Sequence, residues 1–342
     1  MISTGLNIAY SRPDASRHMK YVAAVASVTF AGTDDGLAID DHNDFSPTDG
    51  SNNDKPFSIA VWVRNHIAGT GSTANALLFG KGTTTTTKEY KLFTHYGQLM
   101  FDIIDNADSH YYRVSGPAQT INNPHNTWYH IVATYDGSES ATGMRLYKDG
   151  EELSVTSGSG GSYSGIANTN SKVAIGHRLD NTNYDLDGDM TDIMYWNDYC
   201  LSQEEITQIY NDGQYSVDPT VDTGDYEGAS YCKLWLKCDA QYTVTAASQT
   251  TTYVESEEAP ATPSGGSVEL IAEEHAEFGN CEIREGGNCY KVIDPAGNPA
   301  VYGIEDFSGN NHHASNNGDG VSISAGTVPT ATSVSNEYDT YF

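Results

Sequence analysis

The sequence predicts an all-β sandwich that carries one short helix. Several segments alternate apolar and polar residues with a period of two, which is typical of strands with a buried face. Asp-Gly pairs separate some of these segments, and such pairs favour tight turns between neighbouring strands. One N-capping motif, followed by a short amphipathic stretch, indicates one helix. Short strands at regular spacing with turn signals between them are the pattern of a β-sandwich.

The first clear strands lie at 57–63 and 131–134. In 57–63 the period of two puts Trp62 on one face and four apolar residues on the other, namely Phe57, Ile59, Val61 and Val63. The alternation in 131–134 stops at Asp136-Gly137, a turn pair. Both segments are therefore predicted to be strands.

A hairpin and the helix come next along the chain. The segment 144–147 leads into Asp149-Gly150, which suits a type I′ turn because both central residues of that turn need positive φ. Ser202–Glu205 is a capping box. The helix that it opens is predicted to end at Gly213 and to present one apolar face, made of Ile206, Ile209 and Tyr210.

The order of these elements over 128–213 resembles the laminin-G/pentraxin branch of the concanavalin A-like sandwiches. The stretch contains W-Y-H-I-V-A-T-Y-D-G, then M-R-L-Y-K-D-G-E-E-L, V-A-I-G-H and D-G-D-M-T-D-I-M-Y-W, and then the capped helix. The resemblance implies a concanavalin A-like jelly-roll β-sandwich over 27–214. In this superfamily function lies in loops that are carried by the sandwich.

Three regions are predicted along the chain. Residues 1–26 have no clear period and are expected to form an extended N-terminal arm. The sandwich occupies 27–214, and 65–90 within it is a loop-rich excursion with a run of five threonines. Residues 215–342 form a smaller C-terminal β-rich region, in which 239–268 is a Thr/Ser/Pro-rich loop.

Two C-terminal segments leave part of the architecture open. K-L-W-L-K at 233–237 alternates like a strand, and I-E-D-F-S-G-N-N-H-H-A at 304–314 is similar to a stretch near the start of laminin-G-like domains. These segments could close the sandwich in permuted order or begin a truncated second copy. We favour a small C-terminal β subdomain packed on the first. The pair His312-His313 is interpreted as solvated rather than as a metal site.

The formal charge of −29 over 342 residues limits the partners. Nucleic-acid phosphates and anionic membranes both need basic patches, so we expect no nucleic acid partner and no membrane insertion. No apolar run approaches the ~20 residues of a membrane span. The apolar stretch 21–30 is assigned to the opening of the sandwich rather than to a signal peptide, and no other segment resembles an export leader.

The acidic stretch D-N-T-N-Y-D-L-D-G-D at 180–189 is the candidate metal site. Calcium takes about six to eight oxygen ligands from a flexible loop. The spacing imitates the start of an EF-hand loop, but Met194 stands where a bidentate glutamate belongs. The pentraxin resemblance implies calcium here, although His177 and Arg178 occupy positions where acidic or amide ligands would be expected. The candidate ligands are Asp180, Asp185 and Asp187, and the alternative is that they are ordinary turn acids.

The five cysteines do not form a zinc or redox motif, because no two have CxxC spacing. Cys232 and Cys238 flank an apolar strand and are expected to pack as small hydrophobic residues. Cys281 and Cys289 bracket a predicted hairpin and could form a disulfide in an oxidising compartment.

No catalytic residues are assigned. Glycosidases on this fold carry paired carboxylates in an E-x-D-x-x-E arrangement, and that spacing does not occur in the sequence. Neither a G-x-S-x-G nucleophile motif nor a phosphate-binding glycine loop is present. The 23 tyrosines could serve as contact platforms, but the sequence does not distinguish a ligand-binding set among them.

The chain also resembles the laminin-G-like structural proteins of tailed bacteriophages, particularly acidic ones from marine hosts. That resemblance implies a non-enzymatic virion structural protein displayed on the particle surface, as a capsid decoration, fibre or tail appendage. Its partners would be other virion proteins or copies of itself in a homo-oligomer, and host-surface glycans. The alternative is an extracellular, calcium-dependent carbohydrate-binding module or adhesin of a bacterial surface.

Overall fold

The computed structural model describes residues 26–32, 35–51, 53–68, 75–82, 87–105, 110–178, 184–213, 218–244, 250–256, 267–271, 288–294, 301–317 and 322–325. The predicted N-terminal arm lies outside these ranges, apart from Ala26 at the start of the first strand. Within the described ranges, no helix has the length and hydropathy that a membrane span requires.

The described residues form twenty strands, one α-helix and several 3-10 turns. The strands before the helix are β1 Ala26–Ala31, β2 Gly36–Ile39, β3 Phe57–Asn65, β4 Ala76–Lys81, β5 Tyr90–His95, β6 Gln98–Ile104, β7 Tyr111–Ala118, β8 Trp128–Tyr135, β9 Met144–Lys148, β10 Glu151–Glu152, β11 Thr156–Gly160, β12 Val173–Ile175 and β13 Asp187–Asn197. The helix α1 covers Gln203–Tyr210. The strands after it are β14 Cys232–Val244, β15 Thr250–Ser256, β16 Ser267–Ile271, β17 Asn288–Asp294, β18 Val301–Asp306, β19 Ala314–Asn317 and β20 Ser322–Ala325. The 3-10 turns are η2 Asn43–Phe45, η4 Ala141–Gly143, η5 Asn211–Gly213 and η6 Ala229–Tyr231.

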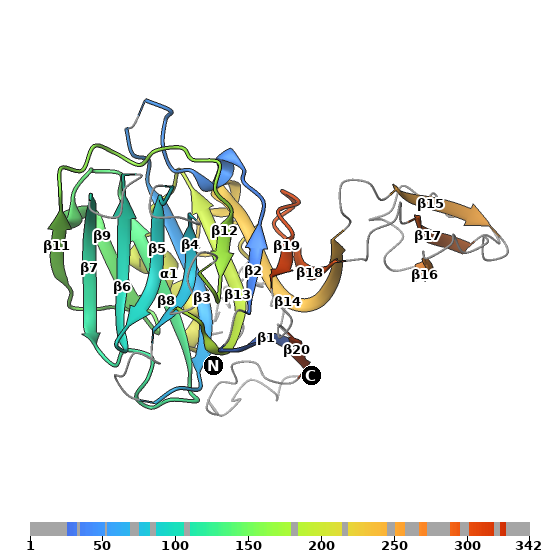
Figure 1. Ribbon diagram of the computed structural model, residues 1–342, viewed down its shortest axis with the longest axis horizontal. Coiled ribbons are helices and arrows are strands. Elements are labelled where there is room, and N and C mark those ends of the chain that lie inside the picture. Colours follow the sequence, from blue (N-terminus) through green and yellow to red (C-terminus); the bar gives the residue numbers. More distant parts are fainter. Residues whose placement is uncertain are drawn as a thin grey trace, which may run out of the picture.

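Antiparallel strands build a sandwich of two layers (Figure 1). In the first layer β9, β8, β3 and β13 are neighbours, and β1 and β14 share the other edge of β13. The second layer has the order β2, β12, β4, β5, β6, β7 and β11. The strands β18 and β19 join β14 to β2 and so connect the layers. The predicted β-sandwich with one short helix is confirmed.

The main core lies between the two layers and follows the predicted alternation. The four residues Phe57, Ile59, Val61 and Val63 of β3 are fully buried in it. The opposite face of β3 is also buried, because α1 covers it: the Trp62 ring stacks on Tyr210 with centroids 5.8 Å apart. Burial of both faces of a central strand explains why its middle, residues 59–63, is apolar without interruption.

The hairpin and the helix form as their local sequences predict. Asp149 and Gly150 both have positive φ, 52° and 84°, between β9 and β10, as a type I′ turn requires. The Ser202–Glu205 capping box opens α1. The helix ends earlier than predicted, because Asn211 takes the left-handed conformation at φ 50° and the chain continues as a 3-10 turn to Gly213.

The prediction of a loop-rich excursion over 65–90 is wrong for its central part. Residues 76–81 form β4, which is buried along its whole length and lies between β12 and β5. The A-L-L-F-G-K sequence lacks polar alternation because both faces of this strand are covered, one by the main core and one by a smaller apolar cluster.

Strands from beyond residue 214 complete the sandwich. Leu236 of β14 pairs with Ile193 of β13, and Ile323 of β20 pairs with Val28 of β1. In addition β19 pairs with β2. Of the alternatives that the sequence leaves open, the strand pairing agrees with closure of the sandwich by C-terminal strands, rather than with a separate subdomain packed on it.

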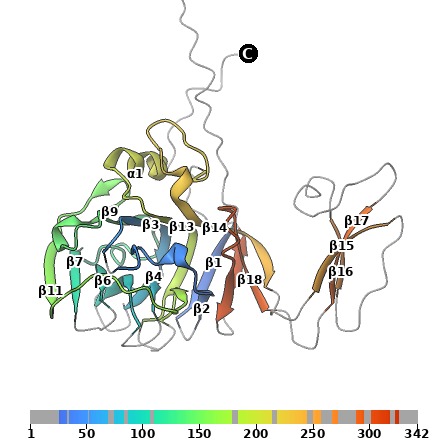
Figure 2. The ribbon, with the colours of Figure 1, turned by 90° about the horizontal axis from the view of Figure 1, so that it is seen from above.

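The strands β15, β17 and β16 form a separate three-stranded sheet, set to one side of the sandwich (Figure 2). This sheet interrupts a hairpin, because Val244 at the end of β14 pairs with Val301 at the start of β18. The predicted loop over 239–268 is therefore partly wrong: it contains the end of β14 and all of β15. Its threonine-rich sequence suits a strand, since Thr is β-branched.

The described cysteines agree with the interpretation of Cys232 and Cys238. Both are buried, and each belongs to an apolar cluster. Cys281 lies outside the described residues. A disulfide between Cys281 and Cys289 therefore stays a prediction.

Candidate ligand-binding face

The outer face of the second layer gathers aromatic and charged side chains on three neighbouring strands. The register sets Lys91 of β5 beside Asp102 of β6, and Asp102 beside Arg113 of β7. One step along the sheet, Phe93 pairs with Met100. The β5–β7 face is defined here as Lys91, Phe93, His95, Tyr96, Asp102 and Arg113, with Arg178 and Tyr184 from the segments that follow β12 and precede β13.

A buried carboxylate organises the cations of this face. The Asp102 side chain is 1% exposed, and Arg113 donates to it through both Nε and Nη2, at 2.6 and 2.7 Å. Lys91 Nζ lies 3.3 Å from the same carboxylate. The hydrogen bonds to Asp102 raise the pKa of Arg113 further above its already high ordinary value. Two cations thus share one carboxylate, which leaves the trio with a net positive charge.

Aromatic rings lie between these charges. Lys91 Nζ and the Arg113 guanidinium lie 4.5 and 5.6 Å from the centroid of the Phe93 ring. Tyr184 meets Phe93 edge to face at 5.8 Å, and the Arg178 guanidinium lies 5.3 Å from the Tyr184 ring. Such cation–π and edge-to-face contacts hold each side chain in a defined orientation.

The rim of the face is formed by the β5–β6 turn. Tyr96 in this turn is 52% exposed and meets the ring of His95 at 4.5 Å. His95 Nδ1 also lies 3.0 Å from the Tyr184 hydroxyl. Partial burial, followed by the nearby Arg113 and Lys91, lowers the pKa of His95. His95 is therefore favoured as a neutral hydrogen-bonding group at pH 7, rather than as a third cation.

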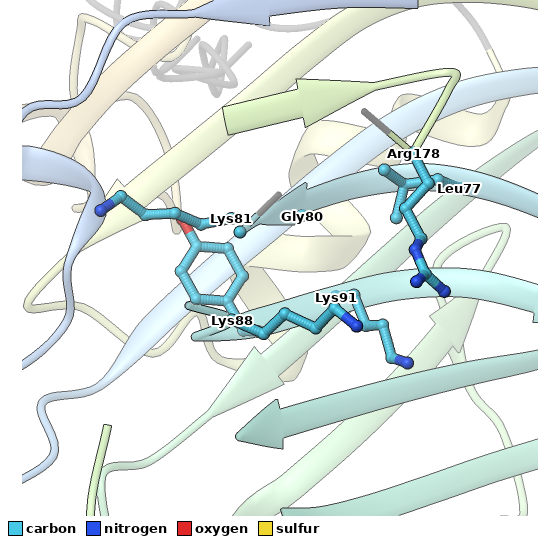
Figure 3. A pocket seen from close by; sticks show the side chains of 8 residues that line it. Leu77, Gly80, Lys81, Lys88, Lys91 and Arg178 are labelled. Carbon is cyan, nitrogen blue, oxygen red and sulfur yellow. The ribbon is translucent and has the colours of Figure 1, made fainter. Parts of the chain in front are cut away.

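A shallow hollow adjoins the face between β4, β5 and the segment after β12 (Figure 3). Its cavity volume is about 10 Å³, roughly the room that one water molecule needs, and is far below the roughly 300–1,000 Å³ of small-molecule pockets. Lys88, Lys91 and Arg178 line it, whereas Lys81 extends away from them into the protein. The combination of a shallow hollow and a broad face suits a surface ligand better than an engulfed one.

The two outer faces of the sandwich differ in what covers them. On the first layer, Ile206 and Ile209 of α1 and Tyr226 of the following loop bury an apolar cluster with Trp196 and Trp235. Among the described residues no helix packs on the second layer, and α1 lies on the opposite side of the molecule (Figure 2). On the β5–β7 face itself Tyr96 is exposed, Phe93 and Asp102 are buried, and the remaining members are half-buried.

The predicted calcium ligands occupy a different place. Asp180 lies outside the described residues. Asp185 Oδ1 contacts His177 Nδ1, and Asp187 Oδ1 lies 3.1 Å from His66 Nδ1. Each described carboxylate thus has a histidine partner of its own. Within the described part of the chain, neither belongs to a group of three side chains that could share one cation. Calcium at Asp180, Asp185 and Asp187 stays a prediction.

Sequence reasoning did not single out the residues of the β5–β7 face. The sequence contains part of the pattern that defines this face. In K-L-F-T-H, F-D-I and Y-Y-R-V, the alternating positions place cations, aromatic rings and a carboxylate on one side of each strand. Strand register was the missing information, because only pairing brings Lys91, Asp102 and Arg113 together. Arg178 and Tyr184 join them from a distant part of the chain.

Comparison with known proteins identifies the fold family. The model of the concanavalin A-like lectin/glucanases superfamily, Laminin_G_3, matches residues 31–207. No curated protein sequence matches the chain.

Several solved structures resemble the chain at low identity. A candidate carbohydrate binding protein from Bacteroides ovatus has 14% identity and a TM-score of 0.47, over 91% of this chain and 62% of that one. The binding domain of botulinum neurotoxin serotype D has 14% identity and a TM-score of 0.40, over 54% and 41%. The sialidase module CBM40 of Ruminococcus gnavus, bound to α2,3 sialyllactose, has 11% identity and a TM-score of 0.35, over 54% and 98%. The chain spans less than two thirds of the length of the first of these structures.

Proposed function

We propose, from the premise that this chain belongs to the concanavalin A-like lectin/glucanases superfamily, that it is a non-enzymatic protein that binds acidic glycans on its β5–β7 face. The observation that carries the proposal is the juxtaposition of Lys91, Arg113 and Arg178 with aromatic rings on a face that no described helix covers. Cations are scarce in this chain, which has a formal charge of −29, so their concentration at one place favours an anionic ligand.

The chemistry of the face matches a sugar that carries a carboxylate or sulfate. Tyr96 offers an exposed ring, on which the apolar side of a sugar ring can stack. The Arg178 guanidinium lies over Tyr184 beside the hollow and can donate two parallel hydrogen bonds to a planar carboxylate. Arg113 is already held by Asp102, so its main contribution is to orient the face.

Binding can be measured by calorimetry with oligosaccharides of equal length that are uronic, sulfated or neutral. We expect the acidic series to bind, and the affinity to fall as salt is raised because the Debye length shortens. Arg178→Ala and Tyr96→Ala should each weaken binding roughly tenfold, which corresponds to about 1.4 kcal/mol.

The matched control is Arg145→Ala. Arg145 is a half-exposed arginine of β9 in the first layer, where it pairs with Glu152. Its removal should leave the affinity unchanged. Equal losses in the Arg145 and Arg178 variants, or equal binding of neutral and acidic sugars, would place the ligand elsewhere or give it another chemistry.

We also propose that this binding protein is displayed on a virion surface, as a capsid decoration, fibre or tail appendage. The support is the resemblance to acidic laminin-G-like phage proteins together with the formal charge of −29. Mass spectrometry of density-purified particles, with immunogold labelling, tests the location. Enrichment with capsid or tail proteins is expected, whereas recovery only from the cell-envelope fraction would favour the bacterial adhesin.

Calcium at Asp180, Asp185 and Asp187 is a further proposal for the same chain. After removal of metals, addition of calcium should raise the melting temperature, and Asp187→Asn should reduce the rise. Asp49→Asn is the control, because Asp49 accepts hydrogen bonds within its own turn. A melting temperature that does not respond to calcium would contradict the proposal.

A further inference from the structure

Two histidines and an aspartate from opposite ends of the chain meet beside η2. Asp44 Oδ2 lies 2.8 Å from His312 Nε2 and 3.2 Å from His42 Nδ1. One nitrogen of each histidine and one oxygen of the aspartate lie within 4.8 Å of one another. His42 and Asp44 follow β2, whereas His312 lies between β18 and β19. In the described part of the chain, this is the group of three that could hold one metal ion.

His312 is held rigidly at this place. Its ring is 9% exposed and lies between His42 and Phe45, at centroid distances of 4.6 and 4.8 Å. Its backbone N–H donates to Asp306 Oδ2 at 2.9 Å. The same carboxylate accepts from the N–H groups of Trp235 and Ser308. The prediction of a solvated histidine pair is therefore wrong for His312, because β18–β19 closure carries it onto the sandwich.

We propose that His42, Asp44 and His312 bind a zinc-type transition-metal ion. Two imidazoles and a carboxylate are a donor set that zinc accepts, with water in the fourth position. At metal–ligand distances of about 2.0–2.1 Å, tetrahedral ligand atoms lie roughly 3.3 Å apart. The observed separations are close to this value for two of the three pairs. His42 Nδ1 accepts from the Asp44 N–H at 3.2 Å, so binding through this nitrogen exchanges that hydrogen bond for the metal.

The donor atoms distinguish this site from the predicted calcium site. Calcium prefers oxygen ligands and a higher coordination number, and it competes weakly for imidazole nitrogen. Zinc at His42, Asp44 and His312 would also link segments 268 positions apart, which a bound ion can do only in the folded chain. Zinc is therefore expected to stabilise the closed sandwich, independently of any glycan on the β5–β7 face.

The test is calorimetric titration of the metal-free full-length chain with zinc, and its melting temperature with and without zinc. We expect one zinc per chain, a higher melting temperature with zinc, and tetrahedral absorption bands when cobalt replaces zinc. His42→Ala is the informative variant, because the His42 side chain is 54% exposed and its loss should leave the fold intact. It should weaken zinc binding by more than about 100-fold, because loss of a direct ligand exceeds the roughly 10–100-fold effect of losing an outer-shell partner.

His110→Ala is the matched control. His110 is a half-exposed histidine at the β6–β7 turn, and its Nδ1 lies 3.2 Å from Asp105 Oδ1. Among the described residues it belongs to no group of three side chains that could share a metal ion. Zinc affinity should be unchanged in this variant. A native chain without stoichiometric zinc binding, or equal affinities in the native, His42→Ala and His110→Ala chains, would overturn the proposal and leave the trio as a hydrogen-bonded contact.

Discussion

At the scale of single residues, the core of this protein contains an ion pair that is fully buried. The Lys81 and Glu89 side chains are both 0% exposed, and Nζ lies 2.7 Å from Oε1. Ser46 Oγ and the Thr169 carbonyl also contact the Lys81 ammonium, at 2.9 and 2.8 Å. Burial raises the pKa of Glu89, and the neighbouring Lys81 counteracts this effect. The pair is tolerated because each charge has several partners.

Lys81→Met should therefore destabilise the protein strongly and in a pH-dependent way. Loss of one partner of a buried pair costs about 3–5 kcal/mol. Without Lys81, hydrogen bonds such as those from Thr169 remain to oppose the effect of burial on Glu89, so its folded pKa rises further above the unfolded value. A raised carboxyl pKa favours folding at low pH, and this contribution is lost as pH rises through the folded pKa. Urea unfolding at pH 5 and pH 8 should show the larger deficit at pH 8.

A surface ion pair provides the control for this variant. Lys55 pairs with Asp198 at 3.1 Å, and both side chains are at least one-third exposed. Lys55→Met should cost under about 1 kcal/mol at either pH. If the Lys81 and Lys55 variants lose the same free energy of unfolding, the buried pair does not have the role described for it.

At the scale of elements, α1 depends on Glu205 more than on its capping serine. Glu205 is 4% exposed and accepts from the Ser202 N–H at 2.8 Å, as a capping box requires. It also accepts from the Tyr199 hydroxyl at 2.8 Å and from the Glu227 N–H at 3.0 Å. One carboxylate thus connects the helix start, the segment before it and the loop that follows it.

Glu205→Ala should cost about 3 kcal/mol, because it leaves several donors without their charged acceptor. Ser202→Ala should cost about 1 kcal/mol, the usual effect of removing an N-cap. Glu204→Ala, at an exposed neighbouring position, should stay within about 0.5 kcal/mol of the native chain. Chemical unfolding of the three variants gives the order, and equal losses at 204 and 205 would exclude the connecting role of Glu205.

At the scale of the whole molecule, the sandwich is closed by strands that are remote in sequence. β14 covers one edge of β13, and β18 and β19 continue the sheet to β2. The separate sheet of β15–β17 contributes no strand to either layer. Without the C-terminal strands, β13 and β2 would expose unpaired backbone groups and apolar side chains such as Tyr195 and Leu37.

Two deletions separate these contributions. A chain that ends at residue 213 should aggregate or lack a cooperative thermal transition, because the edges of β13 and β2 are open. Replacing 245–300 by Asn-Gly should keep the sandwich folded, since Val244 and Val301 are already paired and Asn-Gly suits a two-residue hairpin. Thermal melting followed by circular dichroism measures whether each chain unfolds cooperatively, and size-exclusion chromatography measures whether it aggregates. A well-folded chain ending at 213 would contradict this account of closure.

The sequence by itself determined the features that depend on neighbouring residues. The alternation of β3, the Asp149-Gly150 turn and the Ser202–Glu205 cap are local, because strand faces, positive φ and capping bonds involve residues a few positions apart. The tertiary structure decided which distant segments pair. Because β4 is buried on both faces, its sequence has no polar alternation from which the strand could be predicted. The strand register brings Lys91, Asp102 and Arg113 together on one face. His312 meets Asp44 for the same reason: strand pairing between the chain's two ends has no signature in either segment alone.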